Sequence, residues 1–142
     1  MSLIPGVPDE VVNKVVGLLT EGRSCVIGIV NQTGATLQFD ASNTSVSHGG
    51  LLPPPEQIAP NAIDAAGAHS GDNSMATGCE GIIVYQANDG GQQFQVNLHY
   101  DNPFVGGNSA DASVSISGYA VDAWAGPGDS QAPIRFVLRP AS

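Results

Sequence analysis

Two strand-like runs separated by an Asn-Asp-Gly-Gly turn are the feature that most constrains the fold of this chain. The first run covers residues 80–87 and the second covers residues 92–100. The Asp89-Gly90 step between them is a strong signal for a tight β-hairpin. The side chains available to pack one face of that hairpin are Val84, Phe94, Val96 and Leu98. This hairpin is the most secure local prediction that the sequence allows.

The rest of the chain after residue 23 also consists of short β-rich runs separated by turn residues. Ser24 to Asn31 and Ala35 to Asp40 flank Gln32-Thr33-Gly34, which predicts a second hairpin. The run of prolines at residues 53–55 makes residues 42–60 a loop or sheet edge, because proline donates no ladder hydrogen bond. Further strands are expected at residues 62–66, 112–123 and 134–138.

The composition agrees with an all-β fold, since only 12% of residues are charged while 18 are glycine and 10 are proline. We therefore predict a two-sheet β-sandwich of about seven or more strands over residues 24–139. A chain of 142 residues is long enough to bury one core, so residues 1–142 are expected to form a single domain.

Residues 8–20 form the one predicted helix, and it is amphipathic. Pro8 suits a first helical turn, Asp9 and Glu10 complement the positive end of the helix dipole, and Gly22 can end the helix. Valines and leucines recur at helical spacing along it. This apolar face can pack on the sandwich or enter a membrane interface, and packing is the favoured interpretation.

The formal net charge of −9 limits the partners of the protein. Its four basic residues form no cluster, which disfavours nucleic-acid binding and attachment to anionic lipids through a polybasic patch. Any membrane binding is expected to recognise a headgroup. The N-terminus shows no signal-peptide pattern, so we expect a soluble protein that is cytoplasmic until released, or exported by a non-standard route, and that acts at target membranes.

No residue pattern nominates a catalytic or metal site. His48, His69 and His99 are widely spaced and match no metal-ligand motif. Ser70 lies beside His69 and near Asp72, but it lacks the Gly-x-Ser-x-Gly turn of a hydrolase nucleophile. We therefore expect no enzyme, no cofactor and no bound metal, with a cryptic pair of carboxylates as the remote alternative.

The two cysteines, Cys25 and Cys79, are expected to be buried free thiols. A single disulfide bridge between them is the less favoured interpretation.

The segment Tyr100-Asp101-Asn102-Pro103-Phe104 is the best candidate for a binding loop. Here a predicted strand gives way to a glycine-rich stretch, where aromatic rings can protrude beside hydrogen-bonding groups. A tyrosine hydroxyl, a carboxylate and an aromatic face suit a cationic or polar headgroup, including choline through cation–π attraction. The same groups suit a sugar, which makes a lectin-like module the alternative. A turn that tucks Phe104 into the core is an equally good interpretation of this segment.

Three stretches of the chain resemble the aegerolysin family. They are Val30-Asn31-Gln32-Thr33-Gly34-Ala35-Thr36-Leu37-Gln38, Thr77-Gly78-Cys79-Glu80-Gly81-Ile82-Ile83-Val84-Tyr85 and Tyr100-Asp101-Asn102-Pro103-Phe104-Val105-Gly106-Gly107-Asn108, with Asn88-Asp89-Gly90 between the last two. The similarity covers roughly residues 24–118 and is greatest to bacterial members, including the small component of binary insecticidal crystal toxins.

The resemblance implies a β-sandwich that binds particular membrane lipids and acts as a hemolysin or cytolysin. It further implies pore formation, alone as a homo-oligomer or with a larger pore-forming protein partner. The tryptophan-rich lipid-binding surface of many aegerolysins is reduced here to Trp124, and Val46-Ser47-His48-Gly49-Gly50 stands where many members carry Trp-Gly-Lys, so lipid specificity does not carry over. The N-terminal helix is additional to typical members and resembles that of the actinoporins, whose helix enters the membrane.

Overall fold

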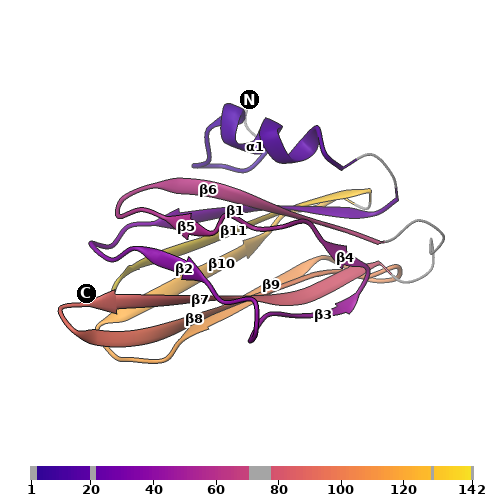
Figure 1. Ribbon diagram of the computed structural model, residues 1–142. Coiled ribbons are helices and arrows are strands. Elements are labelled where there is room, and N and C mark those ends of the chain that lie inside the picture. The colour runs from indigo at the N-terminus through magenta and orange to yellow at the C-terminus, as the bar shows by residue number, and fades with distance from the viewer. Residues whose placement is uncertain (1–2, 20–21, 71–77, 129, 142) are drawn as a thin grey trace.

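A computed structural model describes residues 3–19, 22–70, 78–128 and 130–141 as two packed β-sheets with one N-terminal helix (Figure 1). Sheet A has the strand order β10-β11-β1-β6-β4, and sheet B has the order β5-β2-β7-β8-β9, with β3 paired to β7. The elements are α1 (Asp9–Val16), β1 (Ser24–Asn31), β2 (Leu37–Phe39), β3 (Ser45–His48), β4 (Gly50–Leu51), β5 (Gln57–Ile58), β6 (Ile63–His69), β7 (Cys79–Asp89), β8 (Gln92–Asn102), β9 (Ser109–Val114), β10 (Tyr119–Ala125) and β11 (Gln131–Pro140). The predicted all-β sandwich is confirmed.

The β7–β8 hairpin forms as predicted and dominates sheet B. Its turn residues Gly90 and Gly91 have φ of 60° and 87°, the left-handed region in which glycine is favoured. The Asn88 side-chain oxygen accepts a hydrogen bond from the Gly91 backbone N–H at 3.0 Å. The inward side chains of the hairpin fill the core between the sheets, and they include Ile83, Tyr85, Phe94, Val96, Leu98 and Tyr100.

The predicted hairpin between β1 and β2 is wrong, because the two strands belong to different sheets. β1 pairs in parallel with β11 and antiparallel with β6, whereas β2 pairs with β5 and β7. The buried side chain of Asn31 stabilises the crossing: its Nδ2 donates to the Ala35 carbonyl at 2.8 Å and to the Ala59 carbonyl at 3.0 Å. Its Oδ1 accepts from the Thr33 hydroxyl at 2.7 Å. These bonds replace the ladder that a hairpin would have formed.

The single strand predicted for residues 112–123 is two strands, β9 and β10, in different sheets. Between them the chain leaves sheet B after Ser115, whose backbone N–H donates to the Gln95 carbonyl at 3.0 Å. Gly118, with φ of 96°, then turns the chain toward sheet A. Runs of β-rich residues do not reveal such a change of sheet, since both strands alternate in the same way.

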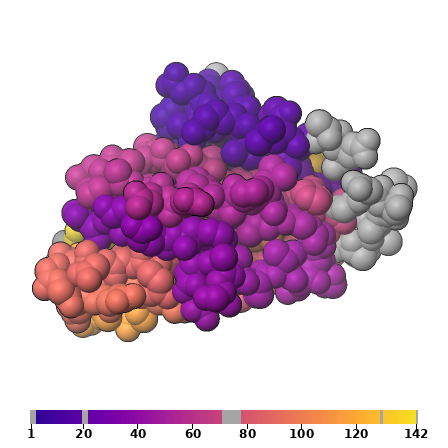
Figure 2. Space-filling view, viewed as in Figure 1, coloured from indigo at the N-terminus to yellow at the C-terminus, as the bar shows by residue number. Residues whose placement is uncertain are grey.

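Helix α1 packs on the outer face of sheet A, on the side away from sheet B (Figure 1). Figure 2 shows the N-terminal segment as a separate ridge above the sandwich. The helix and the residues before it share a second apolar cluster with sheet A, which contains Ile4, Val7, Val12, Val15, Val26, Val30 and Ala65. Because this cluster covers β1, every residue of β1 is buried.

The helix is shorter than the predicted range of residues 8–20, of which residue 20 lies outside the described part. It ends where the Leu18 and Leu19 backbone N–H groups donate to carbonyls three residues earlier, which tightens the chain into a 3₁₀-like turn. Among the described residues no helix is both long enough and apolar enough to span a membrane.

Candidate functional site

The loop between β8 and β9, residues 103–108, places two apolar side chains in solvent at one end of the sandwich. We call it the tip loop. Phe104 is 46% exposed and Val105 is 81% exposed, the largest exposure of any large apolar side chain among the described residues. Adjacent exposed apolar side chains at the end of a folded domain are typical of an interaction surface.

Neighbouring segments fix the base of the tip loop. Gly78, with φ of 67°, lies under it, and a Cβ there would come within 2.3 Å of the Asn102 carbonyl oxygen and 3.0 Å of the Phe104 nitrogen. On the other side the Asn108 Nδ2 donates to the carbonyls of Gly126 and Gly128, both at 2.9 Å. The apolar pair is therefore presented by a loop that is attached on both sides.

A cation lies beside the apolar pair. The guanidinium carbon of Arg23 is 5.2 Å from the centroid of the Phe104 ring, within the range of a cation–π contact. Arg23 comes just before β1, so this contact joins the start of sheet A to the tip loop of sheet B. A guanidinium is well suited to hydrogen-bond a phosphate group.

The structure places two of the predicted site residues inside the protein. β8 continues through Asn102, and its alternation turns Leu98, Tyr100 and Asn102 toward the core. Tyr100 and Asn102 are both 0% exposed. The Asn102 Nδ2 donates to the Ser24 carbonyl at 3.0 Å, which ties β8 to the first residue of β1. The expectation that the ring of Tyr100 protrudes is thus wrong. Of the two interpretations left open for Phe104, the structure shows the exposed one and not a ring tucked into the core.

Asp101 lies on the outer face of sheet B beside a cluster of titratable side chains. His99 in this cluster forms hydrogen bonds from Nε2 to Glu80 at 2.8 Å and from Nδ1 to Asp111 at 3.0 Å. Burial lowers the pKa of His99, but the bonds to Glu80 and Asp111 and their charges outweigh it, so its pKa is raised. Burial, followed by the charge of Glu80, raises the pKa of Asp101.

The described part of the chain contains no group of three or more His, Cys, Asp or Glu side chains able to hold a metal ion. Ser70 is buried, and its hydroxyl accepts a hydrogen bond from the Arg23 backbone N–H at 3.2 Å. Asp72, which the sequence places near Ser70 and His69, lies outside the described residues, as does Thr77 of the aegerolysin-like stretch.

The remaining predicted site residues are Pro103 and Trp124. Pro103 is half-buried at the start of the tip loop. Trp124 is half-buried on β10, where its ring packs against the second apolar cluster and under Arg135, whose guanidinium carbon is 5.3 Å from the ring centroid. Trp124 therefore belongs to the helix side of sheet A. Its role in lipid binding stays a prediction.

Sequence reasoning missed Arg23 as a site residue. It placed the contact in the loop around Tyr100 to Asn108 but did not single out Val105 or Asn108. Val105 could have been found, because an apolar residue directly before Gly106-Gly107 has little chance of being covered by its own strand. Arg23 could not, since it lies far from the tip loop in the sequence and reaches it only because β1 begins there.

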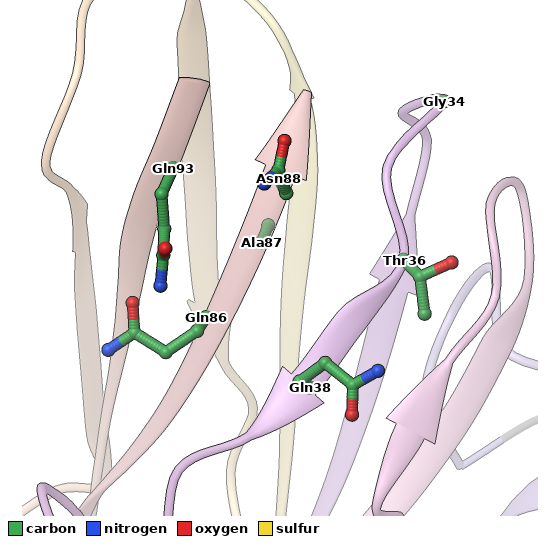
Figure 3. A pocket seen from close by; sticks show the side chains of 7 residues that line it. All are labelled: Gly34, Thr36, Gln38, Gln86, Ala87, Asn88 and Gln93. Carbon is green, nitrogen blue, oxygen red and sulfur yellow. The ribbon is translucent and has the colours of Figure 1, made fainter. Parts of the chain in front are cut away.

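A second candidate site is a polar depression of about 360 Å³ between β2 and the β7–β8 hairpin (Figure 3). Its lining contains no charged side chain and consists of Gly34, Thr36, Gln38, Gln86, Ala87, Asn88 and Gln93. Gln86 is held in place, since its Nε2 donates to Asp40 at 2.8 Å and to Gln95 at 3.0 Å. The depression lies near the hairpin turn, roughly 30 Å along β7 from the tip loop.

Comparison with solved structures shows that this fold is already known in proteins of very different sequence. The structure matches the crystal structure of the lipid-binding protein Nakanori with a TM-score of 0.79 and 13% identity, over 92% of this chain and 79% of that chain. It also matches RahU, crystallised in complex with a TRIS molecule, with a TM-score of 0.61 and 12% identity, over 84% of this chain and 96% of that chain. No protein-family model and no curated protein matches the sequence. The chain therefore shares the β-sandwich fold of a lipid-binding protein.

Proposed function

We propose that this protein binds membrane lipids and that the tip loop is its contact with the bilayer. The observation that carries the proposal is the exposure of Phe104 and Val105 side by side on a loop attached at both ends, with Arg23 beside them. The match of the fold to the lipid-binding protein Nakanori supports it.

The chemistry of the tip suits the interface of a zwitterionic membrane. Phe104 and Val105 can enter the headgroup–acyl boundary, and burying them contributes about 2–4 kcal/mol. Arg23 can pair with a lipid phosphate, while Asp101 can contact a cationic amine or choline. Tyr100, Asn102 and Pro103 then support the loop from beneath. A net charge of −9 disfavours a strongly anionic surface.

Vesicle sedimentation tests this proposal. We expect the protein to sediment with at least one of the phosphocholine, phosphoethanolamine or sphingolipid vesicles in a panel. The double change Phe104→Ala, Val105→Ala should weaken that binding by tenfold or more, as expected from the loss of about 2 kcal/mol.

The matched control is Val46→Ala, Ile82→Ala, which removes two apolar side chains of β3 and β7 that are 40% and 37% exposed. Vesicle binding should be retained in this control. Equal losses in the two double variants would show that the tip is not the contact, and no sedimentation with any vesicle would refute lipid binding itself.

The resemblance to aegerolysins extends the proposal to permeabilisation of the membrane. The protein would act as a cytolysin, alone as a homo-oligomer or with a larger pore-forming partner, and α1 would serve in insertion or oligomerisation. Dye release from the vesicles that bind the protein tests this extension. Release by the chain alone would support a pore of its own, whereas binding without release would leave pore formation to a partner.

Carbohydrate binding is the second candidate function, and the polar depression near the hairpin turn favours it. Its neutral amide and hydroxyl groups suit the hydroxyls of a sugar, and the fixed amide of Gln86 is pre-oriented. A glycan array separates the two functions. Sugar-selective binding that Gln38→Ala, Gln93→Ala abolishes, without vesicle binding, would favour the lectin-like alternative.

A further inference from the structure

The two cysteines of the chain meet between the sheets. Cys25 lies on β1 of sheet A and Cys79 is the first residue of β7 in sheet B. Their Sγ atoms are 3.3 Å apart, both side chains are 0% exposed, and both are free thiols. Each is a rather inert thiol alone, but a facing pair on two different sheets is a potential covalent link between them.

We propose that Cys25 and Cys79 form an oxidisable dithiol that a low-molecular-weight disulfide, such as oxidised glutathione, converts into a disulfide joining the two sheets. In the first step one cysteine thiolate attacks the reagent disulfide, forms a mixed disulfide and releases one glutathione thiolate. In the second step the thiolate of the other cysteine attacks the protein sulfur of the mixed disulfide. This step forms the Cys25–Cys79 bond and releases the second glutathione. The two cysteines lose two electrons and two protons, and oxidised glutathione takes up both to become two thiols.

The geometry requires little movement for this bond to form. A disulfide has an S–S length of about 2.05 Å, so the sulfur atoms must approach by roughly 1.3 Å. The neighbours of Cys25 within its own sheet are small, since it lies opposite Ala68 on β6 and Ala132 on β11. Rotation of the two side chains can supply most of the approach without moving either strand.

The same surroundings determine when the reaction is fast. The hydrogen bond to Cys79, followed by burial, raises the pKa of the Cys25 thiol, so the folded protein holds little thiolate. Oxidation is therefore expected to be slow in the native state and rapid during folding, before the core closes.

The link would lie directly behind the tip loop. Ser24, next to Cys25, accepts the hydrogen bond of Asn102, while Gly78, next to Cys79, supports the loop from below. A covalent bond between Cys25 and Cys79 therefore fixes both supports of the tip relative to each other. It also closes a loop of more than 50 residues, which lowers the conformational entropy of the unfolded chain and so raises the free energy of unfolding.

Refolding with and without oxidised glutathione tests the proposal. The protein is refolded from urea in each buffer and then digested with a protease that cleaves after glutamate. Cleavage after Glu21, Glu56 and Glu80 places Cys25 in residues 22–56 and Cys79 in residues 57–80. We expect the two peptides to be joined only in the oxidised sample and to separate on reduction. The melting temperature should rise by about 10 °C on oxidation.

The single variants Cys25→Ala and Cys79→Ala are the controls, since neither can form the link within one chain. Each should show no rise in melting temperature under oxidising conditions. If either variant fails to fold, the wild-type peptide map and its reversal by reductant still decide the question. Mixed glutathione adducts without joined peptides, or a joined product that melts no higher than the reduced protein, would overturn the proposal.

Discussion

Two buried tyrosines of this protein differ in whether their hydroxyl groups have a partner. The Tyr85 hydroxyl donates to the Pro55 carbonyl at 2.7 Å. The Tyr100 hydroxyl has no hydrogen-bond partner within the described residues, and it fits only because Gly81 lies opposite it, where a Cβ would come within 2.5 Å. A buried hydroxyl without a partner costs free energy that the ring must offset. Tyr100 is thus a core residue whose hydroxyl adds nothing to folding.

Removing each hydroxyl should have opposite consequences. We expect Tyr100→Phe to leave the free energy of unfolding unchanged or to raise it by about 1 kcal/mol, because the variant loses an unpaired polar group. Tyr85→Phe, the matched control, should lower it by about 1 kcal/mol, because it breaks a buried hydrogen bond. Urea unfolding of both variants measures this, and a loss of stability in Tyr100→Phe equal to that in Tyr85→Phe contradicts it. Retained vesicle binding by Tyr100→Phe would further argue that Phe104, not Tyr100, reaches the lipid.

At the scale of elements, local turn signals were predictable from the sequence and changes of sheet were not. Asp89-Gly90 specifies its hairpin because the turn geometry is decided by those residues alone. Gln32-Thr33-Gly34 looks equally turn-like, yet the chain crosses between sheets there because Asn31 bonds to Ala35 and to the distant Ala59. A local sequence pattern around residue 32 cannot reveal the contact with Ala59. The tip loop shows the same limit, since its motif was visible in the sequence but its neighbour Arg23 was not.

Two glycines in sheet A make room for the N-terminal segment. A Cβ at Gly28 would lie 2.6 Å from Val7, and a Cβ at Gly67 would lie 2.6 Å from Val15 and 3.2 Å from Leu52. Helix α1 is further attached by the ion pair between Lys14 and Asp64 at 3.3 Å. The sequence favours packing of the helix on the sandwich over insertion, and the structure shows the helix packed on sheet A.

A methyl group at Gly67 should weaken the docking of α1. Val15 is β-branched and has little freedom to rotate in a helix, so Gly67→Ala should cost about 1–3 kcal/mol. Gly34→Ala is the control, because nothing lies within 4 Å of a Cβ at that position. Hydrogen exchange resolved by residue should become faster in Asp9–Val16 in the first variant and stay unchanged in the second. If the hydrogen-exchange protection of α1 is the same in both variants, close packing at Gly67 does not hold the helix on the sheet.

At the scale of the whole molecule, acidic side chains greatly outnumber basic ones, and His99 lies among carboxylates. It connects β7 and β9 across β8 through Glu80 and Asp111. The charged groups around it include these two carboxylates and Asp101. The charge of His99 opposes the burial and the Glu80 charge that together raise the pKa of Asp101. A protonated His99 therefore offsets part of the repulsion among carboxylates on the outer face of sheet B, in a protein with a net charge of −9.

Stability should consequently depend on pH through His99. Its pKa in the folded state lies above the ordinary value of 6.5, so the folded protein binds the proton more tightly than the unfolded chain does. The stabilisation is then fully present below about pH 6.5 and is lost as the pH rises through the folded-state pKa. Between about pH 6 and pH 9 the free energy of unfolding of the wild type should fall relative to that of His99→Gln. Ser109→Ala, which changes an exposed neutral residue of β9, should follow the wild type. Parallel curves for the wild type and His99→Gln would show that the contacts of His99 with Glu80 and Asp111 do not favour its charged form.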